Sequence, residues 1–375
     1  MRMMPIDLST LVTLPFRSYL ASYSALDHYF RISRSAPVHL LVESDLAGLA
    51  RQFDALSFPG EGFCDAATRV DGTTLLFTCA DDGLPKGQAP FPVTEFLFDV
   101  ERERYIDIGE TYRHLRSRAT EPKLPVDEPV ATVMQAAILE SRYEMSTGVS
   151  SVLEKPHLRD QDIARVSQAE QALLLTEVLT GISPARGLRL LSDMGLVAAW
   201  FPELAAMAET DHSKEYHPEG NVWEHTLHTF EYQKNRDLVL GLALLLHDVG
   251  KPLSEGTREK PFLEHSHHGA SAARRFLRRL DFPEDVIENV AWLVRYHMIP
   301  GALHRLPTRR TASLMRSPLF PDLLELYRCD LSSTFRGPDG YYRACRVYKD
   351  FMKHDRNPYR REDGKKALRH QAGYA

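Results

Sequence analysis

The feature that most constrains this chain is a uniformly apolar segment that ends in two ionisable residues. Residues 238–246 read Leu-Val-Leu-Gly-Leu-Ala-Leu-Leu-Leu, and His247 and Asp248 follow directly. Such a segment is typical of a helix that is buried on all sides, where an unpaired imidazole or carboxylate would cost several kcal/mol. A divalent cation satisfies both groups, because neutral imidazole and carboxylate are ligands of first-row metals. We therefore expect a helical region that is organised around a metal site.

The helical segments on either side of this pair carry further candidate ligands. Each lies within or at the end of a segment with an apolar face, so that several helices are expected to bring their polar residues to one centre. In chain order these polar residues, which are candidates for such a centre, are His225, His247, Asp248, His265, His297 and Asp330. If the register of the helix after residue 264 differs from this expectation, His267 or His268 takes the place of His265.

This ordered set, with Lys251 following the run Asp-Val-Gly, resembles the HD superfamily of metal-dependent phosphohydrolases. Residues 217–227, His-Pro-Glu-Gly-Asn-Val-Trp-Glu-His-Thr-Leu, are similar to the HD tail domain that is fused to some bacterial CCA-adding enzymes. The resemblance implies that a divalent cation is held by His225, His247, Asp248 and Asp330. It also implies that His265 and His297 add a second metal or bind the substrate. Mixed nitrogen and oxygen donors suit Mn, Fe, Co, Ni, Zn or Mg, and they leave open whether one or two ions bind.

A cation on such ligands makes the hydrolysis of phosphate esters the expected chemistry. It polarises a phosphoryl oxygen and lowers the pKa of bound water from 15.7 to about 7. We expect Asp248 also to orient the attacking water and Lys251 to contact the phosphate, although a lysine there also complements a helix dipole. The other candidate substrate-binding residues are His217, Arg274 and Arg278. The two arginines belong to a basic run that reads either as a phosphate-tracking stripe or as a solvated helix face.

The first 120 residues predict a small α/β domain with a mixed sheet. Strands are expected at 38–42, 73–78, 96–98 and 105–108, with a hairpin turn at Asp71-Gly72 and a helix over 45–53. Residues 91–99 and 105–116 resemble the nucleotidyltransferase head of bacterial CCA-adding enzymes and poly(A) polymerases. That family has a Gly-Gly-x-x-Arg-Asp loop and an Asp-x-Asp metal pair, whereas this chain has Ser22–Asp27 and Pro37–His39 at those positions. The resemblance therefore implies a degenerate head in which only Asp27 survives, without nucleotidyltransferase activity.

The pattern after a linker at 121–125 is helical. Helices are expected over 129–145, 160–180 and 183–196, the last with Ser183 as its cap, Pro184 at its first position and Gly195 as its stop. This part resembles the neck of the CCA-adding enzymes, whose helices carry tRNA. The predicted fold class is α+β. Its parts are a mixed nucleotidyltransferase-like α/β domain at 1–120, a helical neck at 121–205, an all-α HD domain at 206–335 and a basic tail at 336–375.

Composition narrows the partners and the location. The net charge of −5 argues against a surface that coats nucleic acid broadly, and no apolar run is long enough to cross a membrane. Four cysteines without a CxxC pattern and the lack of a recognisable signal peptide predict free thiols and a cytoplasmic location.

Two functions follow from these observations. The first is a phosphohydrolase acting on nucleotides or RNA-terminal phosphates, 2′,3′-cyclic phosphates included, with tRNA as a candidate partner. The alternative is an RNA-binding protein of the CCA-adding family with an inactive polymerase site. The sequence leaves the exact substrate, the metal and the oligomeric state open.

Overall fold

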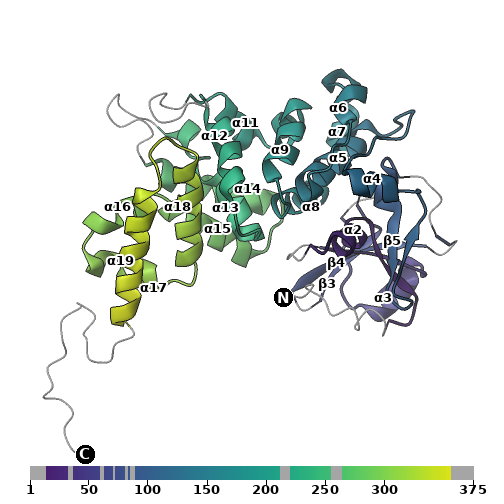
Figure 1. Cartoon of the computed structure of the whole chain (residues 1–375), viewed down its shortest axis with the longest axis horizontal. Helices are drawn as coiled ribbons and strands as arrows, with labels where there is room; N and C mark the ends of the chain where they lie inside the picture. The colour runs from purple at the N-terminus through teal and green to yellow at the C-terminus, as the bar shows by residue number, and fades with distance from the viewer. Residues whose placement is uncertain are drawn as a thin grey trace, which may run out of the picture. The chain divides into compact units, whose positions relative to one another are not determined.

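The computed structural model describes residues 14–32, 37–59, 63–70, 72–80, 83–84, 89–211, 220–254 and 264–355. The chain divides into two compact units (Figure 1). Unit 1 comprises residues 1–205, 235–241 and 277–282, and unit 2 comprises residues 206–234, 242–276 and 283–375. The predicted division into four parts at residues 120, 205 and 335 stays a prediction.

A six-stranded mixed sheet lies in unit 1 and confirms the predicted α/β domain. Its order is β3-β4-β2-β1-β5-β6, and within it the β2–β4 pair is parallel while the other pairs are antiparallel. Val70 pairs with Thr73, as the predicted hairpin requires, and Gly72 has a φ of +79°. The strands are β1 (Ser18–Ala21), β2 (Val38–Val42), β3 (Ala66–Val70), β4 (Thr73–Cys79), β5 (Phe96–Asp99) and β6 (Arg104–Asp107).

Short helices accompany the sheet, and longer ones follow it along the chain. The predicted helix after residue 45 begins where Asp45 accepts a hydrogen bond from the Gly48 amide at 2.7 Å, so its cap is the aspartate. The helices and 3-10 turns of this part are α2 (Ser22–Phe30), α3 (Leu46–Gln52), η1 (Pro92–Glu95), α4 (Tyr112–Ser117), α5 (Pro129–Tyr143), α6 (Val149–Val152), η2 (Lys155–His157), α7 (Asp160–Arg165), α8 (Gln168–Leu179), α9 (Pro184–Asp193) and α10 (Leu196–Trp200).

Two details of the predicted helices are wrong. The single helix expected over 160–180 is the pair α7 and α8, because Ser167 and Glu170 form a capping box that starts a new helix. The Ser167 hydroxyl accepts from the Glu170 amide at 3.1 Å, and the Glu170 carboxylate accepts from the Ser167 amide at 2.8 Å. Ser183 precedes α9, but its hydroxyl donates to Glu144 at 2.7 Å and does not cap the helix.

Unit 2 is built from helices around a buried apolar segment. Residues 242–246 are fully buried, as the uniformly apolar sequence predicts. None of the helices in the described part of the chain combines the length and apolar character that crossing a bilayer requires. The remaining elements are α11 (Pro202–Ala208), α12 (Val222–Thr229), η3 (Phe230–Tyr232), α13 (Leu238–Leu246), η4 (Lys251–Leu253), α14 (His265–Arg279), α15 (Glu284–Tyr296), α16 (Ile299–Ala302), η5 (Leu303–Arg305), α17 (Thr308–Arg316), α18 (Phe320–Ser332) and α19 (Asp339–Asp355).

Candidate metal centre

Helix α12 positions the first of the predicted ligands. Asn221 caps the helix as expected, since its side chain accepts a hydrogen bond from the Glu224 amide at 2.8 Å. This start places His225 one turn into the helix, on the face that is buried against the rest of unit 2. His225 is 0% exposed, so its imidazole requires polar partners inside the protein.

The turn after α13 delivers the His247–Asp248 pair, and α14 closes over it. Both side chains are buried. Gly250 follows two residues later and meets α14 backbone to backbone: a Cβ built on Gly250 would lie 2.0 Å from the His265 carbonyl oxygen and 2.4 Å from the Gly269 amide nitrogen. Because only glycine fits this contact, the start of α14 can approach the turn that carries Asp248.

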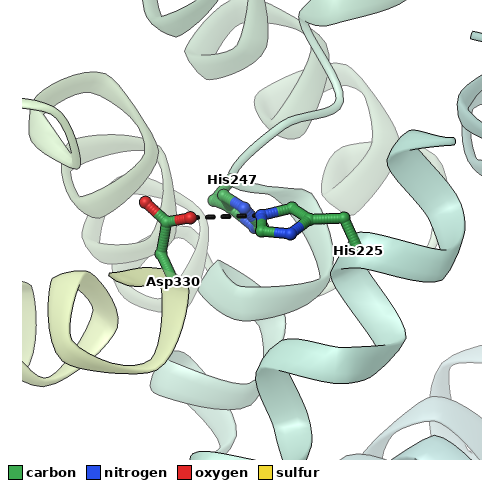
Figure 2. Close-up of side chains that lie close together, drawn as sticks. All are labelled: His225, His247 and Asp330. Atoms are coloured by element: carbon green, nitrogen blue, oxygen red, sulfur yellow. Dashed lines mark hydrogen bonds and ion pairs between the residues drawn. The ribbon is translucent and has the colours of Figure 1, made fainter. Parts of the chain in front are cut away.

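One group of donors consists of His225, His247 and Asp330, which come from α12, the turn after α13 and α18 (Figure 2). The His225 Nε2 atom lies 3.1 Å from the Asp330 Oδ1 atom. One ligand atom from each of the three residues lies within 4.8 Å of the other two. Donors that share one ion at about 2.0–2.2 Å lie roughly 3 to 4 Å apart, so these separations suit a common cation.

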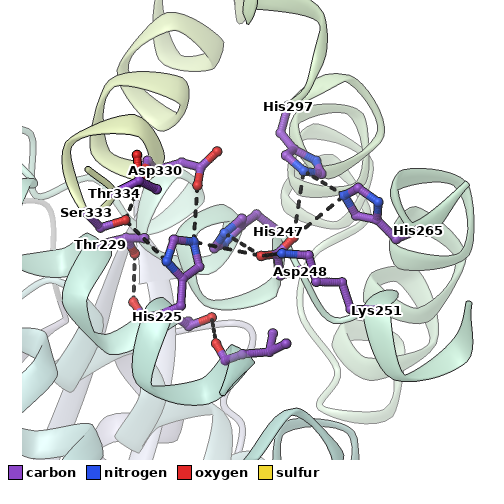
Figure 3. A network of polar contacts seen from close by, with 12 residues as sticks. His225, Thr229, His247, Asp248, Lys251, His265, His297, Asp330, Ser333 and Thr334 are labelled. Carbon is purple, nitrogen blue, oxygen red and sulfur yellow. Dashed lines mark hydrogen bonds and ion pairs between the residues drawn. The ribbon is translucent and has the colours of Figure 1, made fainter. Parts of the chain in front are cut away.

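A second group consists of Asp248, His265 and His297, again with donor atoms within 4.8 Å of one another. Asp248 lies between the first group and the histidines of the second (Figure 3). Its Oδ2 atom is 3.3 Å from His247 Nε2 and 3.9 Å from His225 Nε2, while its Oδ1 atom is 3.7 Å from His265 Nε2 and 3.9 Å from His297 Nε2. The carboxylate therefore turns one oxygen toward each group of histidines.

The hydrogen bonds of the histidines fit a metal site. A carbonyl oxygen only accepts, so the contacts from His247 Nδ1 to Leu244 O at 2.8 Å and from His297 Nδ1 to Val294 O at 2.7 Å place the proton on Nδ1. In the neutral ring Nε2 then carries a lone pair that faces the centre, as metal-ligating histidines require. Among the described residues, His247 Nε2 is a buried atom without a hydrogen-bond partner. A cation would give this orphaned lone pair the partner that it lacks.

His225 is oriented by a residue that was not predicted. The Ser333 hydroxyl donates to the Asp330 carbonyl oxygen at 2.7 Å, so it is free to accept from His225 Nδ1 at 3.3 Å. This contact leaves His225 Nε2 facing the Asp330 carboxylate (Figure 3). A lone pair opposite a carboxylate is favourable only when a proton or a cation is shared between them. A serine three residues after a predicted acidic ligand is the signal that could have pointed to Ser333.

The surroundings of these side chains favour the protonation states that bind metal, which are neutral histidine and ionised aspartate. Burial, against the opposing charge of Asp248 and with smaller contributions from His247 and His265, lowers the pKa of His297 to about 4. His297 is therefore neutral at pH 7. Burial alone would raise the pKa of Asp330, but its contact with His225 and the electrostatic influence of His225 and His247 outweigh burial, so that the pKa lies well below its ordinary range.

The remaining predicted site residues have different positions. Lys251 donates to Asp248 Oδ2 at 2.5 Å, and this places its ammonium group at the centre. Arg274 lies in a two-point ion pair with Glu288, with both contacts at 2.7 Å, and Arg278 has interactions of its own within the chain. His217 lies outside the described residues. The substrate-binding roles of His217, Arg274 and Arg278 stay predictions.

Unit 1 contains a separate buried network of charged side chains. Arg142 pairs with Asp27 at 2.5 Å and with Glu177, and His39 Nε2 lies 2.8 Å from Glu177 Oε1. The Tyr143 hydroxyl donates to Asp27 at 2.9 Å. A pocket of about 520 Å³ lies in the same unit, and residues from α2, β2, α5 and α7 line it; they include Ser22, Tyr23, His39, Gln135, Arg159 and Arg165.

Residues 220–318 match the family model of the HD domain, and this segment carries most of the candidate centre. The matched segment includes the predicted ligands from His225 to His297 and ends before Asp330, which α18 adds.

The whole chain resembles CCA-adding enzymes, as predicted. It is 39% identical over 174 residues to a CC-adding tRNA nucleotidyltransferase of Thermus thermophilus, an alignment that covers 43% of this chain and 38% of the relative. It is 28% identical over 264 residues to a bifunctional uridylyltransferase/uridylyl-removing enzyme of Ruegeria pomeroyi, which covers 62% of this chain and 27% of the relative. The chain thus spans less than two fifths of the length of either protein.

A solved structure shows the same fold. The CCA-adding enzyme of Bacillus stearothermophilus, crystallised with CTP, matches with a TM-score of 0.51 at 16% identity and covers 92% of this chain and 80% of that enzyme. This likeness confirms the predicted fold class, a mixed α/β domain followed by helices.

Proposed function

We propose that unit 2 is a metal-dependent phosphohydrolase that cleaves phosphate esters of nucleotides or of RNA ends, 2′,3′-cyclic phosphates included. The observation that carries this proposal is the position of Asp248, whose two oxygens face two separate groups of histidines. This arrangement supports two ions that share the Asp248 carboxylate. The first would be held by His225, His247 and Asp330, and the second by His265 and His297.

The protein's own residues then have distinct parts in the reaction. Divalent cations at such a centre, when bound, make hydroxide available near pH 7 and polarise the phosphoryl oxygen. Asp248 fixes the spacing of the two groups, because it lies between them. Lys251 holds its positive charge against Asp248 and is close enough to the centre to stabilise negative charge that develops on a phosphoryl group. Neutral His297 keeps its lone pair available as a ligand at pH 7.

The names of the relatives support nucleotide chemistry. Two of them are tRNA nucleotidyltransferases, of Thermus thermophilus and Deinococcus radiodurans, and the Ruegeria pomeroyi protein is named for both uridylyl transfer and uridylyl removal. Removal of a uridylyl group is a reaction at phosphorus of the kind proposed here. These names leave transfer and hydrolysis as competing outcomes for the present chain. The hydrolysis assay and the nucleotide-incorporation assay described below separate them.

The experiment is a hydrolysis assay on the full chain with bis(p-nitrophenyl) phosphate and 2′,3′-cyclic AMP, with Mn²⁺, Co²⁺, Ni²⁺ or Mg²⁺ added. We expect metal-dependent turnover that is lost in the double variant His247→Ala/Asp248→Ala. The matched control is His268→Ala, which removes an exposed histidine of α14 and should leave turnover intact. Equal turnover in the double variant and the wild type would reject the proposal.

The pocket of unit 1 favours a second function, RNA or nucleotide binding without polymerisation. Tyr23 and His39 line this pocket at the positions where the resemblance expects glycine and a metal-binding acid. Asp27, the acid that remains, is paired with buried Arg142. We expect salt-dependent tRNA binding but no incorporation of labelled CTP or ATP into tRNA. Incorporation above the level of a heat-denatured sample would contradict the inactive polymerase site.

A further inference from the structure

We propose that the exposed face of helix α19 binds the phosphate backbone of a single-stranded RNA whose end lies at the HD centre. This inference rests on the proposed hydrolase function and specifies its substrate as an RNA strand instead of a free nucleotide. It is carried by the charge, the exposure and the position of residues on α19, none of which is a predicted metal ligand.

The exposed face of α19 is basic and carries one aromatic ring. Tyr342, Arg346, Lys349 and Lys353 are all exposed, and Tyr342 retains 60% of its accessible surface. They follow one another at intervals of four, three and four residues, which places them on one side of a helix. The opposite side, with Ala344 and Phe351, is buried where α19 packs on α16, α17 and α18.

The three cations on this face have no acidic partner among the residues that the structure describes. Of the acids of α19, Asp355 forms an ion pair with Arg316 at 2.7 Å, and exposed Asp350 forms no ion pair with this face among the described residues. Exposed lysine and arginine side chains without carboxylate partners repel one another and attract a polyanion. This face therefore favours the binding of a negatively charged strand.

The charge of this end of the chain differs from that of the rest. Residues 335–375 contain eleven lysines and arginines and five aspartates and glutamates, a net charge of +6, although the whole chain carries −5. The first 334 residues thus carry −11. Such asymmetry is typical of proteins in which one part contacts nucleic acid while the remainder repels it.

The position of α19 connects this face to the centre. Gly340, at the start of α19, packs against Tyr327 and Leu331 of α18, beside the turn that carries Asp330. At the far end Asp355 reaches Arg316 of α17. In Figure 1 α19 lies alongside α18. From Tyr342, near the start of α19, the basic face extends about 16 Å to Lys353, at about 1.5 Å per residue.

This geometry fits a strand that leaves the HD centre and continues along α19. Several consecutive phosphates of one strand can contact the three cations over this length. Tyr342, at the end nearest the centre, offers a ring on which a base can stack, and such stacking tolerates any base. The predicted substrate is therefore an RNA end that is recognised by its backbone and with little sequence preference.

The test compares RNA binding with the turnover of a small substrate. Binding of a fluorescein-labelled 12-nucleotide single-stranded RNA is measured by anisotropy between 50 and 200 mM NaCl, for the wild type and for Arg346→Glu/Lys349→Glu/Lys353→Glu. We expect at least tenfold weaker binding and a slope of log K against log salt that is smaller by about 2, since each lost phosphate contact contributes about 0.7. Turnover of bis(p-nitrophenyl) phosphate should not change. The neutral triple variant with glutamine at these positions replaces the charge reversal if the latter does not fold.

A control variant and two further readouts decide between the outcomes. Arg51→Glu/Arg113→Glu/Arg116→Glu makes the same change of charge at exposed positions of α3 and α4 in unit 1 and should retain RNA binding. Equal loss in both triple variants would overturn the proposal, and so would stronger binding to phosphatidylglycerol vesicles than to RNA. The proposed hydrolase function fails separately, through the lack of small-substrate turnover in the wild type with every metal tested.

Discussion

Gly250 lies against the backbone of His265, so closely that a methyl group on Gly250 would come within 2.0 Å of the His265 carbonyl oxygen. Gly250 follows the Asp248 turn, and His265 begins α14. The contact therefore sets the distance between a carboxylate and an imidazole of the candidate centre, whose nearest atoms are 3.7 Å apart. The φ of Gly250 is −83°, which every residue can adopt, so the turn itself does not require glycine. The close contact with α14 is what requires a residue without a side chain.

We expect Gly250→Ala to destabilise the protein and to weaken metal binding. The added methyl group must displace α14 from the turn, and such overpacking costs about 2–3 kcal/mol. The free energy of unfolding in urea and the affinity for Mn²⁺ by calorimetry measure the two effects. Ser271→Ala, on the exposed side of α14, should change neither. A Gly250→Ala protein with wild-type stability and wild-type Mn²⁺ affinity would show that the contact does not position His265.

The two groups of donors predict a stoichiometry of two ions for each chain. Asp330→Ala removes a donor of the first group, and His297→Ala removes one of the second, so each variant should retain one ion. Asp248→Ala should lose affinity for both, because its oxygens face both groups. Metal analysis after gel filtration gives the stoichiometry, with His268→Ala as the control. Two tightly bound ions in Asp248→Ala would contradict the shared carboxylate.

The lowered pKa of His297 predicts a loss of stability in acid when metals are chelated. The folded protein protonates His297 only below about pH 4, whereas the unfolded chain does so below its ordinary value of 6.5. Between these values the unfolded chain binds more protons, so the free energy of unfolding falls as the pH is lowered, by up to about 3 kcal/mol. Urea unfolding with EDTA at pH 7.5, 6 and 5 measures the decrease. In His297→Gln the decrease should be smaller; an unchanged decrease would assign it to other groups.

Lys251 is expected to serve the reaction more than the binding of metal. Its ammonium group contacts Asp248, yet it brings no lone pair to the centre while it is charged. Lys251→Met should therefore retain the metal stoichiometry and lower kcat by about 10² to 10³, the usual effect of removing one group that stabilises transition-state charge. Lys251→Arg should restore part of the rate. If Lys251→Met released an ion with no further effect on kcat, the lysine would instead be a support for Asp248.

Arg142 is expected to be essential for the stability of unit 1. Its guanidinium is fully buried between Asp27 and Glu177. Removing one partner of a buried ion pair leaves uncompensated charge and costs about 3–5 kcal/mol. Arg142→Met should lower the free energy of unfolding by this amount, whereas Arg113→Met, an exposed change in α4, should have little effect. If Arg142→Met lowered the free energy of unfolding by less than about 1 kcal/mol, the prediction would be wrong. Asp27 and Glu177 would then become neutral by protonation at little cost in stability.

The residues of the candidate centre could be picked out from the sequence because several of them have a signal close to them in the chain. His247 and Asp248 end an apolar helix, His225 follows a recognisable cap, and these local patterns survive folding. The pairing of distant residues has no such signal. Nothing near Asp27 or Glu177 announces that Arg142 will lie between them, since the contacts join residues 115 and 35 positions apart.

The same reasoning explains the errors in the predicted helices. The pattern over 160–180 has helical periodicity on both sides of Ser167, and periodicity alone does not detect a capping box inside it. Ser183 has the residue type of a cap, but its hydroxyl donates instead to Glu144, at the end of α5. The sheet order was also beyond reach, because the parallel pairing of β2 with β4 depends on which strand edges remain available after folding.

The donors of the candidate centre come from α12, the turn after α13, the start of α14, the end of α15 and α18, and Asp330 on α18 is the last of them in the chain. During synthesis, the histidines from 225 to 297 leave the ribosome before the acid that completes their set. A nascent or truncated chain that ends before α18 would lack one donor of the proposed centre. Full metal binding would therefore indicate that the helical unit has been synthesised and folded through α18.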